Sequence, residues 1–171
     1  MKYYYLILIF CSLNLYGQKN NTANWKNNHD IPRWAVKEFN NRGLDEKYII
    51  TYQLYPSFLQ GDFNGDKRKD VAILVAEQST NKLGIAIIHG KHPQALRYQI
   101  NIIGAGESLG DIGDNFKWVD IWNKFKSNSR ELNNVRLPAV HGDVINLQEK
   151  DKRNGIIFWD GRDYNWRSIK K

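Results

Sequence analysis

The distribution of apolar residues first marks off an N-terminal segment of the chain. Residues 1–17 have one early cation, Lys2, followed by the apolar run at 6–10 and then by smaller and more polar residues. This order is typical of a signal peptide, and the run is too short for a membrane-spanning helix, which needs about 20 residues. We therefore predict cleavage after Gly17, a secreted or periplasmic location, and no transmembrane segment in the processed chain. Residues 18–29 are polar and Asn-rich, and are predicted as a flexible leader.

An amphipathic helix is predicted directly after this leader. Asp30 can cap its first turn, Pro32 suits that turn, and Gly43 favours the left-handed conformation that ends a helix. The apolar side chains that share one face of this helix are Ile31, Trp34, Ala35 and Phe39.

From residue 48 onward the apolar positions follow the period of β-strands. Short polar connections between these segments favour antiparallel pairing over helical crossovers. Residues 116–125 are predicted as a short helix or an aromatic-rich loop, and residues 127–134 as an exposed excursion. The predicted strands are 48–55, 70–76, 83–89, 97–103 and 143–147, followed by a hairpin over 155–167 that turns at Asp160 and Gly161.

These elements predict a single compact α+β domain over residues 30–171. It would contain one mainly antiparallel β-sheet and the N-terminal helix, because a chain of this length supports one core rather than two.

The only cysteine, Cys11, lies in the signal segment, which excludes disulfides, cysteine–zinc sites and thiol nucleophiles from the processed protein. The 25 Lys and Arg residues and 18 Asp and Glu residues are mostly interspersed, and no nucleic-acid-binding motif accompanies them. Short cationic clusters at 67–69 and 150–153 could favour an anionic partner.

The loop at 62–70 carries the clearest chemical signal. Side-chain oxygens fall at positions 1, 3, 5 and 9 of this loop, and position 7 can offer its backbone carbonyl. Calcium takes about six to eight oxygen ligands, which a tight loop with alternate inward oxygens supplies. Without a cation, the three carboxylates of the loop repel one another. The predicted calcium ligands are Asp62, Asn64, Asp66, Arg68 and Asp70.

The pattern Asp-x-Asn-Gly-Asp-x-x-x-Asp runs directly into an apolar strand, not into the helix of an EF-hand. Over residues 61–76 it resembles the calcium loop of FG-GAP/VCBS-type repeats, which occur in integrin-like propellers and many secreted bacterial proteins. Lys67 stands where that family usually has glycine. Only one repeat is present, whereas a propeller needs at least about four blades, so a full propeller is not predicted. The flanking segments look like small secreted proteins of Bacteroidetes-type bacteria, which implies a compartment but no activity.

The cationic run at 67–69 leaves a second interpretation of this loop open. In that interpretation the loop is a metal-free turn whose carboxylates are partly neutralised by the neighbouring Lys and Arg side chains. The cations would weaken calcium binding in either case. Extracellular calcium is nevertheless plentiful enough to fill a site with a Kd of about 10⁻⁴–10⁻³ M.

A second segment matches a catalytic pattern. Gly106–Gly110 fits the G-x-S-x-G nucleophile elbow, with Ser108 as the nucleophile, and downstream acids and His141 follow in the hydrolase order. The elbow needs a helix directly after it and a parallel sheet, and neither is predicted here. The acidic residues of the loop at 107–114 could instead act as paired carboxylates in glycoside hydrolysis.

The sequence thus predicts a non-enzymatic, secreted or periplasmic calcium-binding domain with a structural, adhesive or envelope-binding role. Its partner would be an envelope or extracellular protein or glycan, and not a nucleic acid. Two alternatives remain open at this point. One is a small hydrolase that uses Ser108 or the 107–114 loop, and the other is an envelope inhibitor or immunity-type protein that buries exposed aromatic side chains in its partner.

Overall fold

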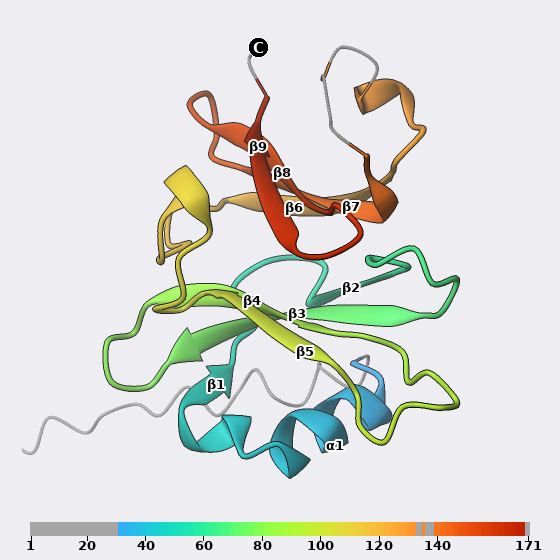
Figure 1. The fold of residues 1–171 in the computed structure, drawn as a ribbon. Coiled ribbons are helices and arrows are strands. Elements are labelled where there is room, and N and C mark those ends of the chain that lie inside the picture. The colour runs from blue at the N-terminus through green and yellow to red at the C-terminus, as the bar shows by residue number, and fades with distance from the viewer. Residues whose placement is uncertain (1–30, 133–134, 136–138, 170–171) are drawn as a thin grey trace, which may run out of the picture.

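The computed structural model describes residues 31–132, 135 and 139–169 of the chain (Figure 1). The predicted signal peptide at 1–17, the leader at 18–29 and the expected cap Asp30 lie outside the described residues. No helix in the part of the chain that the structure describes is long and apolar enough to cross a membrane.

The predicted N-terminal helix forms as α1 (Arg33–Asn41), with Pro32 at its N-cap position. It ends before Gly43, whose φ of 67° is left-handed, and a short 3₁₀ turn, η2 (Leu44–Glu46), follows. Ala35 and Phe39 are buried against the first sheet, as their helical spacing predicts. Figure 1 shows α1 beneath this sheet, on the side away from the second sheet.

The first sheet contains five antiparallel strands, and its central strand is β3 (Asp70–Glu77). On one side β3 pairs with β4 (Leu83–Ile88), which in turn pairs with β5 (Ile100–Gly104). Its other edge is shared by β1 (Tyr48–Ile50) and β2 (Phe58–Gly61). The strand predicted at 48–55 therefore ends early, because β2 occupies the remaining length of that edge.

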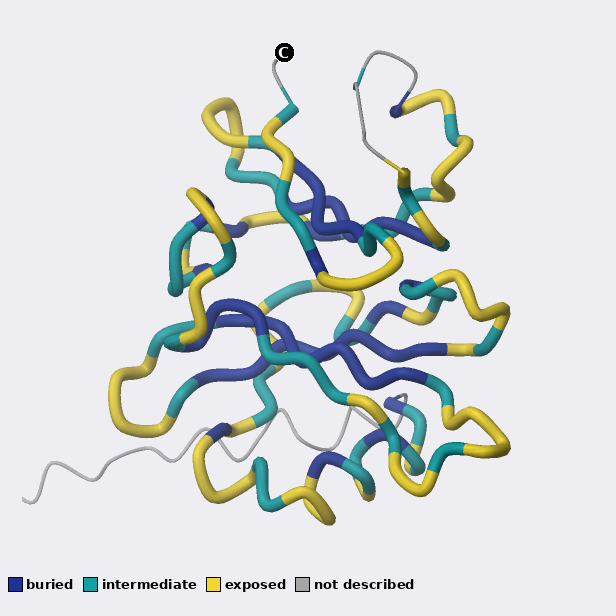
Figure 2. Tube along the Cα trace, in the orientation of Figure 1, coloured by how far each residue is buried: buried dark blue, intermediate teal, exposed yellow. Residues whose placement is uncertain are grey.

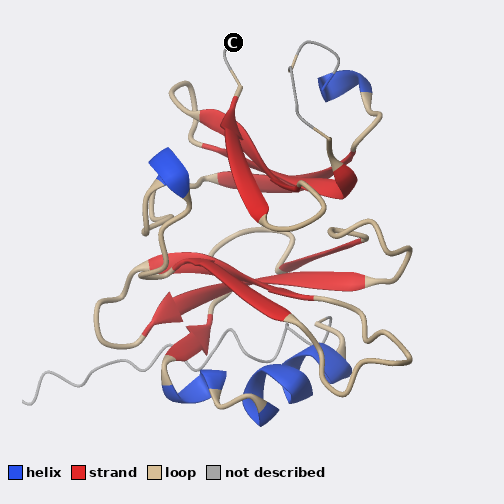
Figure 3. Cartoon of the chain, in the orientation of Figure 1, coloured by secondary structure: helices blue, strands red, loops and turns tan. Residues whose placement is uncertain are grey.

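The second sheet contains four strands in the order of the chain. They are β6 (Ile121–Lys126), β7 (His141–Gln148), β8 (Asn154–Trp159) and β9 (Tyr164–Ser168). The α+β class and the antiparallel pairing are confirmed, with the strands divided between two sheets instead of one. Two 3₁₀ turns, η3 (Gly110–Ile112) and η4 (Arg130–Leu132), lie outside the sheets (Figure 3).

The prediction of a short helix or an aromatic-rich loop at 116–125 is wrong for residues 121–125, which belong to strand β6. The β6 segment pairs with β7 along its whole length, and Trp122 lies opposite Leu147. Trp122 is almost fully buried, and its indole Nε1 donates a hydrogen bond of 2.7 Å to the carbonyl oxygen of Pro56. The apolar residues of this segment do not alternate, because Trp122 packs in the core between the sheets and Phe125 packs on the other face of the second sheet, so the period of a strand is not visible in the sequence. The excursion predicted at 127–134 includes η4, whose Leu132 is buried.

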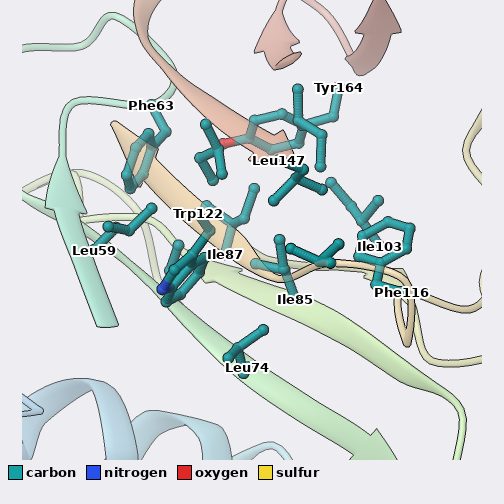
Figure 4. Packing of buried hydrophobic residues seen from close by; sticks show 14 of the residues in the cluster. Leu59, Phe63, Leu74, Ile85, Ile87, Ile103, Phe116, Trp122, Leu147 and Tyr164 are labelled. Carbon is teal, nitrogen blue, oxygen red and sulfur yellow. The ribbon is translucent and has the colours of Figure 1, made fainter. Parts of the chain in front are cut away.

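The two sheets face each other across the main core. Figure 2 shows the buried residues concentrated along the strands of both sheets. Alternate residues of β3 and β4 point toward the second sheet or toward α1, so both faces of the first sheet are covered. Figure 4 shows side chains of both sheets meeting in this core, among them Ile85, Ile87, Trp122, Leu147 and Tyr164.

Candidate functional site

The predicted calcium loop connects β2 to β3 at the end of the first sheet. Gly61 and Asp70 are paired across the two strands, so the residues between them form a wide hairpin loop. Asp62 closes this loop, because its carboxylate accepts hydrogen bonds from the amides of Gly65 at 2.7 Å and Lys67 at 3.0 Å. The side chains of Asn64 and Asp66 each accept a bond from the amide two residues further on, at 3.1 and 2.8 Å. Such bonds between side chain and backbone are what Asp and Asn contribute to turns.

The loop backbone is left-handed at two residues. Gly65 has a φ of 79°, and Lys67 has a φ of 65°. A residue other than glycine costs roughly 1–2 kcal/mol in this conformation. This cost gives a physical reason for the glycine that FG-GAP/VCBS-type loops usually have where this chain has Lys67. Lys67 therefore places a strained residue at the point where the resemblance departs from the family pattern.

Asp70 is fully buried at the base of the loop. Its carboxylate accepts hydrogen bonds from the amides of Phe63 at 2.6 Å and Gly90 at 2.7 Å. Burial raises the pKa of Asp70 to about 6, and the nearby carboxylates of Asp66 and Asp62 contribute to this rise against the effect of the two amides. The loop thus brings three carboxylates close enough to influence one another.

His89 connects the loop to the second sheet. His89 directly follows β4 and is buried, and its Nδ1 accepts a hydrogen bond of 3.2 Å from the side-chain Nδ2 of Asn64. Its Nε2 lies 2.7 Å from the hydroxyl oxygen of Tyr164 in β9. Burial lowers the pKa of His89, whereas the charges of Asp66 and Asp62 act in the opposite direction. The neutral imidazole that results donates through Nε2 to the Tyr164 oxygen.

The sequence analysis did not identify this role of His89, which in sequence stands three residues before His92 at the end of a predicted strand. The structure separates the two side chains. His92 is exposed and accepts a bond from the amide of Gln94. The position of His89 at the end of a fully apolar strand was the available signal that its side chain is buried.

A second connection to the other sheet runs through Asp62. The Asp62 amide donates to Oδ2 of Asp143 at 3.2 Å, and the Asp143 amide donates to the carbonyl oxygen of Asp62. The preceding residue, Gly142, has a φ of 81°, and a Cβ atom there would lie 2.1 Å from the Asp62 carbonyl oxygen. Only glycine therefore permits β7 to approach the loop this closely.

Four of the five predicted ligands have side-chain oxygens that accept hydrogen bonds from backbone amides within this single loop: Asp62, Asn64, Asp66 and Asp70. The fifth, Arg68, contributes a guanidinium whose Nε lies 3.6 Å from Asp66 and whose Nη1 donates to the Lys91 carbonyl oxygen at 3.4 Å. Among the described residues, no group of three or more His, Cys, Asp or Glu side chains is arranged as a formed metal site. Calcium binding at this loop therefore stays a prediction.

The alternative catalytic residues lie elsewhere in the molecule. Ser108 is exposed between β5 and η3, and a three-residue 3₁₀ turn stands where the nucleophile elbow needs a helix. Within the described chain, no hydrogen bond joins Ser108 to a histidine. Two of the three acidic residues of the 107–114 loop pair with individual lysines: Glu107 lies 3.0 Å from Lys47, and Asp114 lies 2.5 Å from Lys82.

Any functional assignment for this chain rests on its own sequence and structure, because comparison with known proteins gives no match. The likeness to the FG-GAP/VCBS-type calcium loop accordingly rests on residues 61–76 themselves. No protein-family model, curated protein or solved structure matches this chain.

Proposed function

We propose that this protein is a non-enzymatic domain of the cell envelope or extracellular space in which calcium, bound by the 62–70 loop, stabilises the packing of two β-sheets. The sheets would then present a rigid surface for a structural, adhesive or envelope-binding role. The proposed ligands are the side chains of Asp62, Asn64, Asp66 and Asp70 with the backbone carbonyl of Arg68.

The observation that carries this proposal is the environment of Asp70. Its carboxylate is fully buried, and the charged groups that act on it most strongly are Asp66 and Asp62, both negative. Burying an ionised carboxylate among like charges is unfavourable unless a cation compensates it. A calcium ion in the loop would supply that compensation and would favour the ionised form of all three carboxylates.

The hydrogen bonds within the loop are compatible with such an ion. Each oxygen of Asp62 accepts one amide, and the Oδ1 atoms of Asn64 and Asp66 also accept one amide each. Because a carboxylate or amide oxygen has two lone pairs, each of these oxygens retains acceptor capacity for a cation. The chemistry of the donor set, with oxygen atoms only, fits calcium rather than a transition metal.

The location of the loop links this binding to the fold. Asp62 is hydrogen-bonded to Asp143 of β7, and Asn64 connects through His89 to Tyr164 of β9. An ion that fixes the loop would therefore also fix the contact between the first and second sheets. A weak extracellular site is sufficient for this role, because extracellular calcium occupies sites with a Kd of about 10⁻⁴–10⁻³ M.

Thermal unfolding with and without calcium tests the proposal. At a 100-fold excess over Kd, calcium should stabilise the folded state by about 2.7 kcal/mol and raise Tm by several degrees. Magnesium should do less, because it requires tighter octahedral geometry and releases its waters reluctantly. Asp66→Ala should abolish the shift. Lys67→Gly should strengthen calcium binding, since it relieves a left-handed lysine and removes a nearby positive charge.

Asp111→Ala is the matched control, because Asp111 is an exposed aspartate outside the loop. It should retain the full calcium-dependent change in Tm. Identical melting curves in calcium and in chelator would contradict the proposal and would favour the metal-free turn. The same conclusion would follow if Asp66→Ala changed stability equally with and without the ion.

A further inference from the structure

A cationic cleft lies between the 62–70 loop and the edge of the second sheet. Lys67, Arg68 and Lys69 of the loop line one wall, and Lys124 and Lys126 of β6 line the other. The cleft has a volume of about 410 Å³. The two groups of cations are more than 50 residues apart in the sequence, so their common cleft is a product of the fold.

The second wall is organised by a buried carboxylate. Asp143 is 3% exposed, and its oxygens lie 2.9 Å from the Nζ of Lys126 and 3.4 Å from the Nζ of Lys124. Burial alone would raise the pKa of Asp143, but the hydrogen bonds from Lys126 and the Asp62 amide, together with the two lysine charges, hold it below its usual value. One ionised carboxylate thus holds two ammonium groups at the same side of the cleft.

The remaining charge in the cleft is only partly neutralised. Five cations and two carboxylates, Asp62 and Asp143, line the cleft, which leaves an excess of three positive charges. Arg68 approaches Asp66, whereas Lys67 and Lys69 form no ion pair with a described residue. Like charges gathered in one concave site repel one another and focus a positive potential, which an incoming anion relieves.

We propose that this cleft binds a compact multivalent anion of the phosphate or pyrophosphate class. The excess of three positive charges matches an anion that carries several charges in a small volume. Both kinds of cation in the cleft bind phosphate oxygens, the four lysines as point charges and Arg68 through its planar fork. The cleft has room for a larger molecule that carries such a group. This inference does not depend on calcium, although an ion at Asp62 would offset one negative charge of the lining and increase the affinity for the anion.

Calorimetric titration with sodium pyrophosphate at low ionic strength tests the inference. The protein should first be depleted of calcium and desalted, because a chelator is itself a polyanion and because pyrophosphate binds calcium. We expect saturable binding that weakens as salt is added. Lys67→Gln/Lys69→Gln should weaken pyrophosphate binding at least tenfold. These two side chains are exposed and make no ion pair with a described residue, so their removal should not disturb folding.

The matched control is Lys37→Gln/Lys117→Gln, which removes two exposed lysines outside the cleft and changes the net charge by the same amount. It should leave the pyrophosphate Kd within about twofold of the unmodified protein. Equal losses in the two double variants would overturn the inference, since they would reduce it to attraction by net charge. Absence of saturable binding to the calcium-free protein would overturn it as well, whatever the outcome of the calcium experiment.

Vesicles identify the source of the anion once pyrophosphate binding is established. Phosphatidylcholine vesicles with phosphatidic acid present the same phosphate chemistry on a lipid headgroup. If the protein binds these vesicles at a lipid-phosphate concentration below its Kd for pyrophosphate, the cleft is assigned to a lipid headgroup. Weaker retention would assign it to a soluble or glycan-borne phosphate.

Discussion

At the scale of single residues, the 62–70 loop places a carboxylate in an environment that resists ionisation. Asp70 is buried, accepts two amide hydrogen bonds and lies near two other aspartates. Its raised pKa of about 6, against an ordinary value of 3.8, means that protonation favours the folded state. The stability contributed by protonated Asp70 is fully present below about pH 4 and is lost as pH rises through about 6.

The protonation of Asp70 provides a direct prediction. In calcium-free protein, carboxyl-carbon NMR should show Asp70 titrating with a pKa of about 6, and saturating calcium should lower that pKa because the ion favours the carboxylate. Direct titration of Asp70 is preferable to a measurement of unfolding free energy against pH, because a second group also contributes to that dependence. His89, whose pKa is lowered, contributes stability above its ordinary pKa that is lost as pH falls, which opposes the contribution of Asp70. A pKa close to the ordinary value without calcium would contradict the prediction.

At the scale of secondary-structure elements, the main feature is the close approach of β7 to the 62–70 loop. Two hydrogen bonds join Asp62 to Asp143, residues that are 81 positions apart in the chain. Gly142 makes this approach possible, because a side chain there would collide with the Asp62 carbonyl oxygen. Gly142 also has a positive φ, so it combines two separate requirements for glycine.

Replacement of Gly142 should separate those two requirements. We expect Gly142→Ala to reduce the free energy of unfolding by about 3 kcal/mol or more, because the added Cβ forces β7 away from the loop. Gly110→Ala is the control. Gly110 also has a positive φ, of 56°, but a Cβ atom added there would meet no other atom within 4 Å, so this variant should lose only about 1–2 kcal/mol.

Urea denaturation of both variants measures this difference. Equal losses of unfolding free energy would mean that backbone conformation, rather than contact with the loop, determines the requirement for glycine at residue 142. Gly142→Ala should also weaken calcium binding if the loop binds the ion, since the displaced contact holds the loop at Asp62.

At the scale of the whole molecule, the helix and the two sheets form three layers, and the candidate loop lies where the sheets meet (Figure 1). This arrangement explains how one loop can influence a large part of the structure. It contacts β7 through Asp62, and it reaches β9 through Asn64 and His89. A calcium requirement in this architecture suits a compartment in which free calcium is abundant.

Export of the protein is the corresponding prediction. Residues 1–17 show the charged, apolar and small-residue order of a signal peptide, so mass spectrometry of the exported protein should show loss of about these residues and a new N-terminus at Gln18. Recovery of an intact chain from Met1 in the cytoplasm would contradict this prediction. It would also remove the argument that extracellular calcium fills a weak site.

The sequence determined the features that depend on neighbouring residues. Helical spacing predicted α1, Gly43 ended it, and the apolar runs with short polar links predicted the β3–β4 and β8–β9 hairpins. The pattern of residues 62–70 likewise predicted a tight loop that runs into β3, whereas the hydrogen bonds that its Asp and Asn side chains accept from loop amides were revealed by the structure. Each of these features arises from local periodicity, turn chemistry or side-chain hydrogen bonds, which a short stretch of sequence contains in full.

Only the tertiary structure decided how these pieces meet. The strands divide into two sheets, and the aromatic β6 segment becomes a strand because Trp122 is buried between them. The contact between Asp62 and Asp143, the bond between His89 and Tyr164, and the cleft between Lys67 and Lys126 all join distant parts of the chain. Such contacts depend on the register and packing of whole sheets, and local sequence patterns do not encode which distant residues will become neighbours.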